Sequence, residues 1–387
     1  MSGHSPGMVW SRRQILVAAG MALAAGKAGA APAARVAVAP CRDYAGGVLP
    51  ALRKMFDDLG GLERLVAGKT VAVKINMTNP LRARTGHRAA WYTRWSHPAV
   101  IGTAVHLIGA AGARKVRILE GSWEDDNPLE ENFLQGGWDP RDLLRAAANV
   151  EMENTDSLGL GKKYARLKVP GGGSIFPAFD CNQSYADCDV LVSIAKLKEH
   201  QTAGVALALN NMLGIAPATI YGDAAGIEEP ARRPNGRRTM FHTGRRQPSS
   251  TAPAETRPDS PRDAGYRIPR VTVDLVGARP IDLAIIDGIE TQTSTEGAAP
   301  AAGSARAIHL VKPGVLVAGL NAVCTDAVAM ALMGFDPAAD RGTPPFETCD
   351  STLALAEDAG IGTRDLGKIE IVGPPLERLR FPFRRYQ

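Results

Sequence analysis

Cysteine is scarce in this chain, and no two cysteines are closely spaced. Five cysteines occur in 387 residues, and none belongs to a Cys-x-x-Cys motif. A structural zinc knuckle or a ferredoxin-type cluster needs such local groups of thiols, so the sequence contains no iron–sulfur motif. Cys181 and Cys188 are close enough in the chain to form a disulfide in an oxidising compartment. Cys324 lies in an apolar helical pattern, which indicates a buried thiol.

The chain also lacks a strong charge of either sign. It has 45 basic and 40 acidic residues, a formal net charge of +5. Loss of an amino-terminal segment holding Arg12, Arg13 and Lys27 would reduce that charge to about +2. Proteins that bind nucleic acid usually carry a strong basic stripe, so the charge balance predicts no nucleic-acid partner.

A long apolar run is missing as well, although residues 1–30 have the pattern of an export signal. Arg12 and Arg13 precede a short apolar segment that ends at Ala30, in the sequence SRRQILVAAGMALAAGKAGA. A bilayer span needs about 20 apolar residues, so we expect no membrane span in the mature chain. The twin arginine predicts the twin-arginine export machinery as a partner and a periplasmic or otherwise exported location. An amphipathic or anchoring amino-terminal helix is the alternative.

From residue 31 onward, short apolar runs alternate with helical patterns. Such alternation predicts an α/β fold: a mainly parallel sheet with flanking helices, in Rossmann-like layers, as one domain over residues 31–387. We expect strands at 69–75, 115–121, 188–195, 280–288 and 314–320. We expect helices at 97–113, 139–150 and 321–334, and a buried helix at 202–214.

Residues 222–267 interrupt this alternation. The segment is rich in arginine, proline and serine and poor in aliphatic residues. Such a composition predicts a flexible, exposed or partly disordered insertion. Its arginines could contact anionic material, but a solvated loop is the simpler interpretation.

Polar clusters follow several of the expected strands. They include Lys74 and Asn76, then Glu120, then Lys196, Lys198 and His200, and finally Asp287. Ligands of open parallel sheets bind outside the carboxyl ends of the strands. We therefore expect Lys74, Lys196, His200 and Asp287 to converge on one pocket. Each cluster also has a structural alternative, because strand-end lysines are commonly solvated and Asp287 could cap a turn.

Other polar residues have stronger structural explanations. His97, directly before Pro98, is expected to cap a helix, and His106 and His309 are expected to be structural. Asn210 and Asn211 need hydrogen-bond partners if they are buried, either on a ligand or on nearby backbone.

The sequence resembles the family called domain of unknown function 362. The resemblance rests on KIN (74–76), HP (97–98), EGS (120–122), KLKEHQTAGVALALNNMLG (196–214), IIDGIETQTSTEG (285–297) and GLNAVCTDAVAMALMGFDP (319–337). It spans most of the mature chain and implies the same fold and the same site position. Family members typically have Lys-Pro-Asn where this chain has Lys74-Ile75-Asn76, and Lys-Asn where it has Asn210-Asn211. Many relatives carry ferredoxin cysteine runs, which this chain lacks.

These observations lead to one predicted site with two functional interpretations. We expect His200, Asp287 and Lys196 to be catalytic, and Lys74, Asn76, Lys198 and Asn211 to bind a cofactor or a small anionic ligand. His200, Asp287 and Glu296 are candidate ligands of a divalent metal. Asp326 is a further candidate that could merely complement a helix dipole. The protein is either a cofactor- or metal-dependent enzyme acting on a small anionic compound, or a non-catalytic periplasmic binding or assembly protein.

Overall fold

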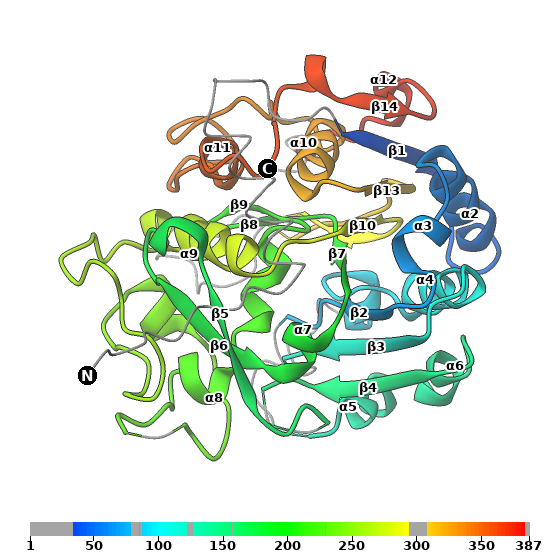
Figure 1. The fold of residues 1–387 in the computed structure, drawn as a ribbon. Coiled ribbons are helices and arrows are strands. Elements are labelled where there is room, and N and C mark those ends of the chain that lie inside the picture. Colours follow the sequence, from blue (N-terminus) through cyan, green and yellow to red (C-terminus); the bar gives the residue numbers. More distant parts are fainter. Residues whose placement is uncertain are drawn as a thin grey trace, which may run out of the picture.

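A central eight-stranded sheet organises the chain in a computed structural model (Figure 1). The structure describes residues 34–78, 85, 87–121, 127–156, 158, 160–228, 230–293 and 308–383. The predicted signal segment and Glu296 lie outside these described residues.

The sheet is mainly parallel, as expected, and its strand order is β14-β1-β13-β10-β7-β2-β3-β4. All neighbouring strands pair in parallel except those on either side of β13, which is antiparallel to both β1 and β10. The strands are β1 (Arg35–Pro40), β2 (Thr70–Lys74), β3 (Lys115–Glu120), β4 (Val150–Asn154), β7 (Val190–Lys196), β10 (Leu283–Gly288), β13 (Val315–Gly319) and β14 (Glu370–Val372). The five strands predicted from sequence are all confirmed.

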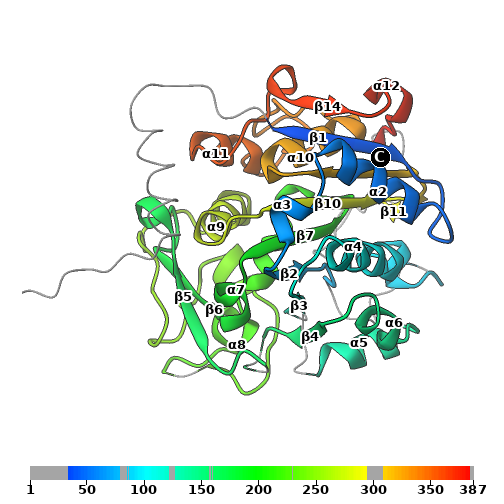
Figure 2. The ribbon, with the colours of Figure 1, turned by 45° about the vertical axis from the view of Figure 1, so that its right-hand side comes forward.

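Helices cover both faces of the sheet, and each face has its own apolar core (Figure 2). One face packs on α2 (Val48–Asp58), α3 (Glu63–Val66), α4 (Pro98–Ala110), α5 (Leu129–Gln135) and α6 (Pro140–Leu144). The other packs on α7 (Gln183–Asp187), α8 (Ala218–Tyr221), α9 (Ala264–Ala278), α10 (Ala322–Leu332), α11 (Thr352–Asp358) and α12 (Leu376–Leu379). We call these the α4 face and the α9 face. Three small two-stranded sheets complete the fold: β5 (Tyr164–Lys168) with β6 (Ala178–Asn182), β8 (Lys198–His200) with β9 (Gly204–Ala206), and β11 (Thr291–Gln292) with β12 (Leu310–Val311).

His97 caps helix α4, as predicted. The His97 side chain accepts a hydrogen bond from the Ala99 N–H at 3.1 Å, and Pro98 occupies the first helical position. Beyond the helix, Gly112 has a φ of +87°, the left-handed conformation that glycine adopts easily after a helix. The local sequence was therefore sufficient to position this helix.

The helix expected at residues 202–214 does not form. Its first part is strand β9, and residues 210–215 form a 3-10 helix, η3 (Asn210–Ile215). Asp326 accepts hydrogen bonds from the Ala208 and Leu209 N–H groups, both at 2.9 Å. A buried carboxylate thus satisfies backbone groups that an α-helix would have paired internally.

The insertion expected at 222–267 to be solvated is only partly so: many of its described residues are exposed, but others are buried. Met240 and Phe241 are fully buried in the core of the α9 face. Arg267 and Glu255 form an ion pair without exposed side-chain surface, with Nη2 and Oε1 2.5 Å apart. A few well-placed apolar residues and paired charges therefore fold a segment whose composition alone suggests disorder.

The described residues contain five buried free cysteines, so Cys181 and Cys188 do not form a disulfide. Within the same residues, no helix is long and apolar enough to cross a membrane.

Candidate functional site

A cavity of about 160 Å³ opens at the carboxyl ends of β2 and β3 on the α9 face. Its walls come from the ends of β2 and β3, the β8–β9 hairpin, the 3-10 helix η3, the insertion and helix α9. The predicted residues Lys74, Asn76, Lys198, His200 and Asn211 all line it. The cavity thus has the position that an open parallel sheet favours for a ligand.

An ion pair between Lys74 and Glu120 forms one wall of the cavity. Lys74 Nζ lies 2.6 Å from Glu120 Oε2, and both side chains are almost completely buried. Nζ also donates to the Ile75 carbonyl at 2.6 Å and to Asn211 Oδ1 at 3.0 Å. Burial lowers the pKa of Lys74 and raises the pKa of Glu120 to about 7, because water no longer stabilises either charge.

A second ion pair, between Arg237 and Asp156, lies directly beside the first. Arg237 Nη2 and Asp156 Oδ1 are 2.7 Å apart, and Arg237 Nε donates to the Ala216 carbonyl at 2.6 Å. Two glycines allow this close packing. A Cβ at Gly121 would lie 2.9 Å from Arg237 Nη2, and one at Gly214 would lie 2.8 Å from Lys74 Nζ.

Further cations and two neutral imidazoles complete the cavity. Lys198 is buried and donates from Nζ to the Arg94 carbonyl at 3.2 Å, whereas Arg238 is exposed. Burial lowers the pKa of His200 to about 3 and that of His242 to about 4, so both rings are uncharged at neutral pH. The His200 Nδ1 atom accepts a hydrogen bond from the Thr202 N–H at 3.2 Å.

The lining therefore carries a net positive charge, although Lys74 and Arg237 are each paired with a buried carboxylate. Four positive side chains surround the cavity against the single carboxylate of Glu120; they are Lys74, Lys198, Arg237 and Arg238. In addition, Asn210 Oδ1 is buried without a hydrogen-bond partner in the described structure. An anionic ligand that also carries a hydrogen-bond donor would complement both features.

Lys196 and Asp287 do not reach this cavity, so the predicted convergence of four strand-end residues is wrong. Both lie on the α4 face, where Lys196 Nζ is 2.9 Å from Asp287 Oδ2 and neither side chain is exposed. The reason is strand alternation. Lys74 pairs with Ser193, and Lys196 is an odd number of positions beyond Ser193, so the two lysines point to opposite faces.

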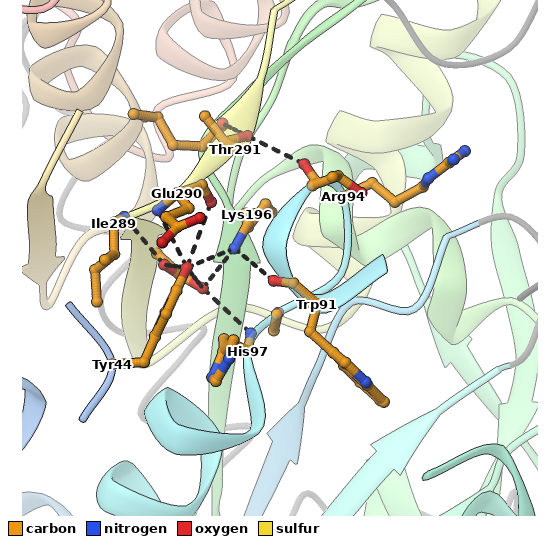
Figure 3. Close-up of polar contacts among 12 residues, drawn as sticks. Tyr44, Trp91, Arg94, His97, Lys196, Ile289, Glu290 and Thr291 are labelled. Carbon is orange, nitrogen blue, oxygen red and sulfur yellow. Dashed lines mark hydrogen bonds and ion pairs between the residues drawn. The ribbon is translucent and has the colours of Figure 1, made fainter. Parts of the chain in front are cut away.

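A compact polar cluster satisfies this buried pair (Figure 3). The Tyr44 hydroxyl donates to Asp287 Oδ1 at 3.0 Å, and Lys196 Nζ donates to the Trp91 carbonyl at 2.9 Å. The Tyr44 ring stacks on His97 at a centroid distance of 3.6 Å. Burial lowers the pKa of Lys196 and lowers that of His97 to about 3.

The candidate metal ligands are not brought together. His200 lines the cavity, Asp287 belongs to the separate cluster, and Glu296 lies outside the described residues. Among the residues that the structure describes, no group of three or more His, Cys, Asp or Glu side chains is placed to hold a metal ion. The described residues therefore do not fit the metal site expected from sequence.

Several cavity residues escaped the sequence analysis. The strand-end cluster at Glu120 predicts no role for that residue, and no local pattern marks Arg237, Arg238 and His242. The same is true of Asp156, the buried partner of Arg237. Arg238 and His242 bound a π-helix, η4 (Arg238–His242), an uncommon element that often occurs at functional sites. An arginine-rich segment far along the chain offers no local signal that it packs beside β2.

Among the comparisons with known proteins, the family model identifies a family but no reaction. The family model described as "Domain of unknown function (DUF362)" matches residues 71–331. A solved crystal structure of a protein from Thermotoga maritima is similar at 12% identity with a TM-score of 0.34. That alignment covers 81% of this chain and 58% of the other, so this chain spans less than two thirds of its length. Curated proteins yield no match.

Proposed function

The chain belongs to the DUF362 family of unknown function, and on that premise we propose that it captures a small anionic compound in the cavity beside Lys74. One observation supports this function above all: four cationic side chains face a cavity that holds a single carboxylate. Hydrogen bonds between charged partners contribute about 1.5–3 kcal/mol each. Two such bonds would be enough to select an anion over a neutral compound of the same shape.

Titration calorimetry with small anions tests the proposal. Sulfate, oxalate, succinate and citrate would each be titrated into the protein at low salt, and we expect saturable binding of at least one. Arg238→Gln should weaken that binding about tenfold, because it removes one cation from the cavity wall. Arg233→Gln is the matched control, since Arg233 is an exposed arginine of the same segment that does not line the cavity. Equal losses in both variants, or no binding of any anion, would reject the proposal.

A catalytic role is favoured by the shifted titration of groups in the cavity. Burial moves the pKa of Glu120 to about 7 and that of His200 to about 3, and such shifts are common at active sites. The alternative is a non-catalytic periplasmic binding or assembly protein. Mass spectrometry of the bound anion after incubation separates the two, because an enzyme changes its ligand and a binding protein returns it intact.

We also propose that the protein is exported by the twin-arginine route. The support is the sequence around Arg12 and Arg13, which lies outside the described residues. Cleavage after Ala30 would leave the described fold whole, because β1 begins at Arg35. A cavity facing the periplasm would then meet small anions from outside the cytoplasm.

A further inference from the structure

One carboxylate oxygen of Glu120 is hydrogen-bonded within the protein, and the other can accept or share a hydrogen bond with a ligand in the cavity. Oε2 is 2.6 Å from Lys74 Nζ, whereas Oε1 has no hydrogen-bond partner among the described residues. The close approach of Gly214 confines the carboxylate, since a Cβ there would lie 3.0 Å from Oε1. The side chain is 4% exposed and lines the cavity. A ligand in the cavity would therefore meet Oε1.

An anion in this cavity would compete with Glu120 for positive charge. Lys74 Nζ can donate three hydrogen bonds, and Glu120, Ile75 and Asn211 take all three. An incoming anion must displace one of these partners or lie beside the Glu120 carboxylate. Two like charges so close in a buried site cannot both remain ionised without a large cost, and protonation of one of them removes the repulsion.

We infer that Glu120 is the proton-exchanging group of the cavity: it takes up one proton from solvent when an anion binds beside Lys74. This inference rests on the proposed function. The proton resides on Oε1, so the neutral carboxylic acid donates an O–H hydrogen bond to the bound anion. The ligand class that fits is an oxyanion or carboxylate, which offers one oxygen to a cation and another to this acid.

The charges around Glu120 place its titration in the neutral range. Lys74 from β2 and Arg237 from the insertion favour the ionised form, while burial and Asp156 favour the protonated form. Their balance gives Glu120 a pKa of about 7, so the free site holds a readily protonated carboxylate. The other titratable or charged groups that face it are Tyr185 from α7 and, around the cavity, Lys198, His200, Arg238 and His242.

Calorimetry in buffers of different ionisation enthalpy counts the protons taken up on binding. The probes are sulfate and oxalate, neither of which titrates near neutral pH. For a group of pKa about 7, roughly three quarters of the free sites are ionised near pH 7.5, so we expect uptake of about 0.5 to 0.8 proton per anion. Affinity should be nearly constant below the pKa and should fall by up to about tenfold per pH unit above it.

Two variants assign the proton. Glu120→Gln should still bind sulfate or oxalate but with no proton uptake and no pH dependence between about pH 6 and about pH 8.5. A double variant, His200→Asn with His242→Asn, should retain the uptake, because these rings do not titrate near neutral pH. If Glu120→Gln does not fold, the comparison of proton uptake between the wild type and the double variant still tests whether the two histidines take up the proton.

The outcomes separate the inference from the function on which it rests. Saturable anion binding without proton uptake would overturn the role of Glu120. Loss of proton uptake in the double histidine variant would do the same. Neither result would contradict the proposed anion binding. If neither sulfate nor oxalate nor any other anion of the panel binds saturably, both the role of Glu120 and the proposed function are overturned.

Discussion

Lys196 and Asp287 show how a charged pair can be part of a protein core. Their side chains have no exposed surface, and each ion is bonded on several sides. Asp287 accepts from Lys196, Tyr44 and the His97 N–H, the last at 3.2 Å. The pair joins β7 and β10 to the start of α4. Its completeness indicates a structural role on the α4 face.

Asp287→Ala should therefore destabilise the fold, whereas substitution of an exposed ligand-binding residue should cost little stability. Removal of one partner leaves a buried ammonium ion uncompensated, which costs about 3–5 kcal/mol. Urea unfolding measures the loss. Lys54→Ala is the control, because Lys54 is mostly exposed in its pair with Asp58 and should change stability by less than about 1 kcal/mol. A stable Asp287→Ala protein with impaired anion binding would instead restore the catalytic role first expected for Asp287.

At the scale of elements, the insertion is the part of the fold that completes the cavity. Its π-helix η4 carries Arg238, Phe241 and His242 to the cavity, and Arg237 precedes it. The segment is anchored by the Arg237–Asp156 and Arg267–Glu255 ion pairs. The buried side chains of Met240 and Phe241 join it to the core of the α9 face.

Deletion of residues 230–260 should consequently destabilise the protein and abolish anion binding. The deletion removes Met240 and Phe241 from the core and leaves Asp156 without Arg237 and Arg267 without Glu255. Two unpaired buried charges cost about 3–5 kcal/mol each, and lost apolar burial adds to this, so the total cost is comparable to the stability of a typical domain, about 5–15 kcal/mol. Soluble yield and thermal unfolding are the measurements. An unchanged melting temperature of the deletion variant, with fast amide exchange at Met240 and Phe241 in the intact protein, would instead show that the segment is a solvated loop.

For the whole molecule, export is the property that can be tested without knowledge of the ligand. Arg12→Lys with Arg13→Lys should leave the precursor in the cytoplasm, because the export machinery recognises the arginine pair. Fractionation and amino-terminal sequencing should place wild-type protein in the periplasm with a terminus near Ala30. The control is Arg42→Lys with Arg53→Lys, two exposed residues beyond the expected cleavage site. Normal export of the first double variant would contradict the prediction.

The sequence by itself determined five of the eight strands of the sheet and the edge at which the cavity opens. Periodicity located β2, β3, β7, β10 and β13, and the strand-end polar clusters marked the carboxyl edge. These features are local, because apolar runs, caps and turn residues act over a few positions. For the same reason, the cap at His97 was predictable from its neighbour Pro98.

Only the tertiary structure decided which strand-end residues share a cavity. Lys74 and Lys196 both follow apolar strands, yet the register between β2 and β7 sends them to opposite faces. Arg237 meets Asp156 across 81 residues of chain, and no local pattern encodes such a contact. The insertion is ordered by the same kind of long-range pairing, since ion pairs and a few buried apolar residues compensate for its polar composition. Register and distant contacts arise only when the chain is packed, which is why the cavity could not be assembled from the sequence alone.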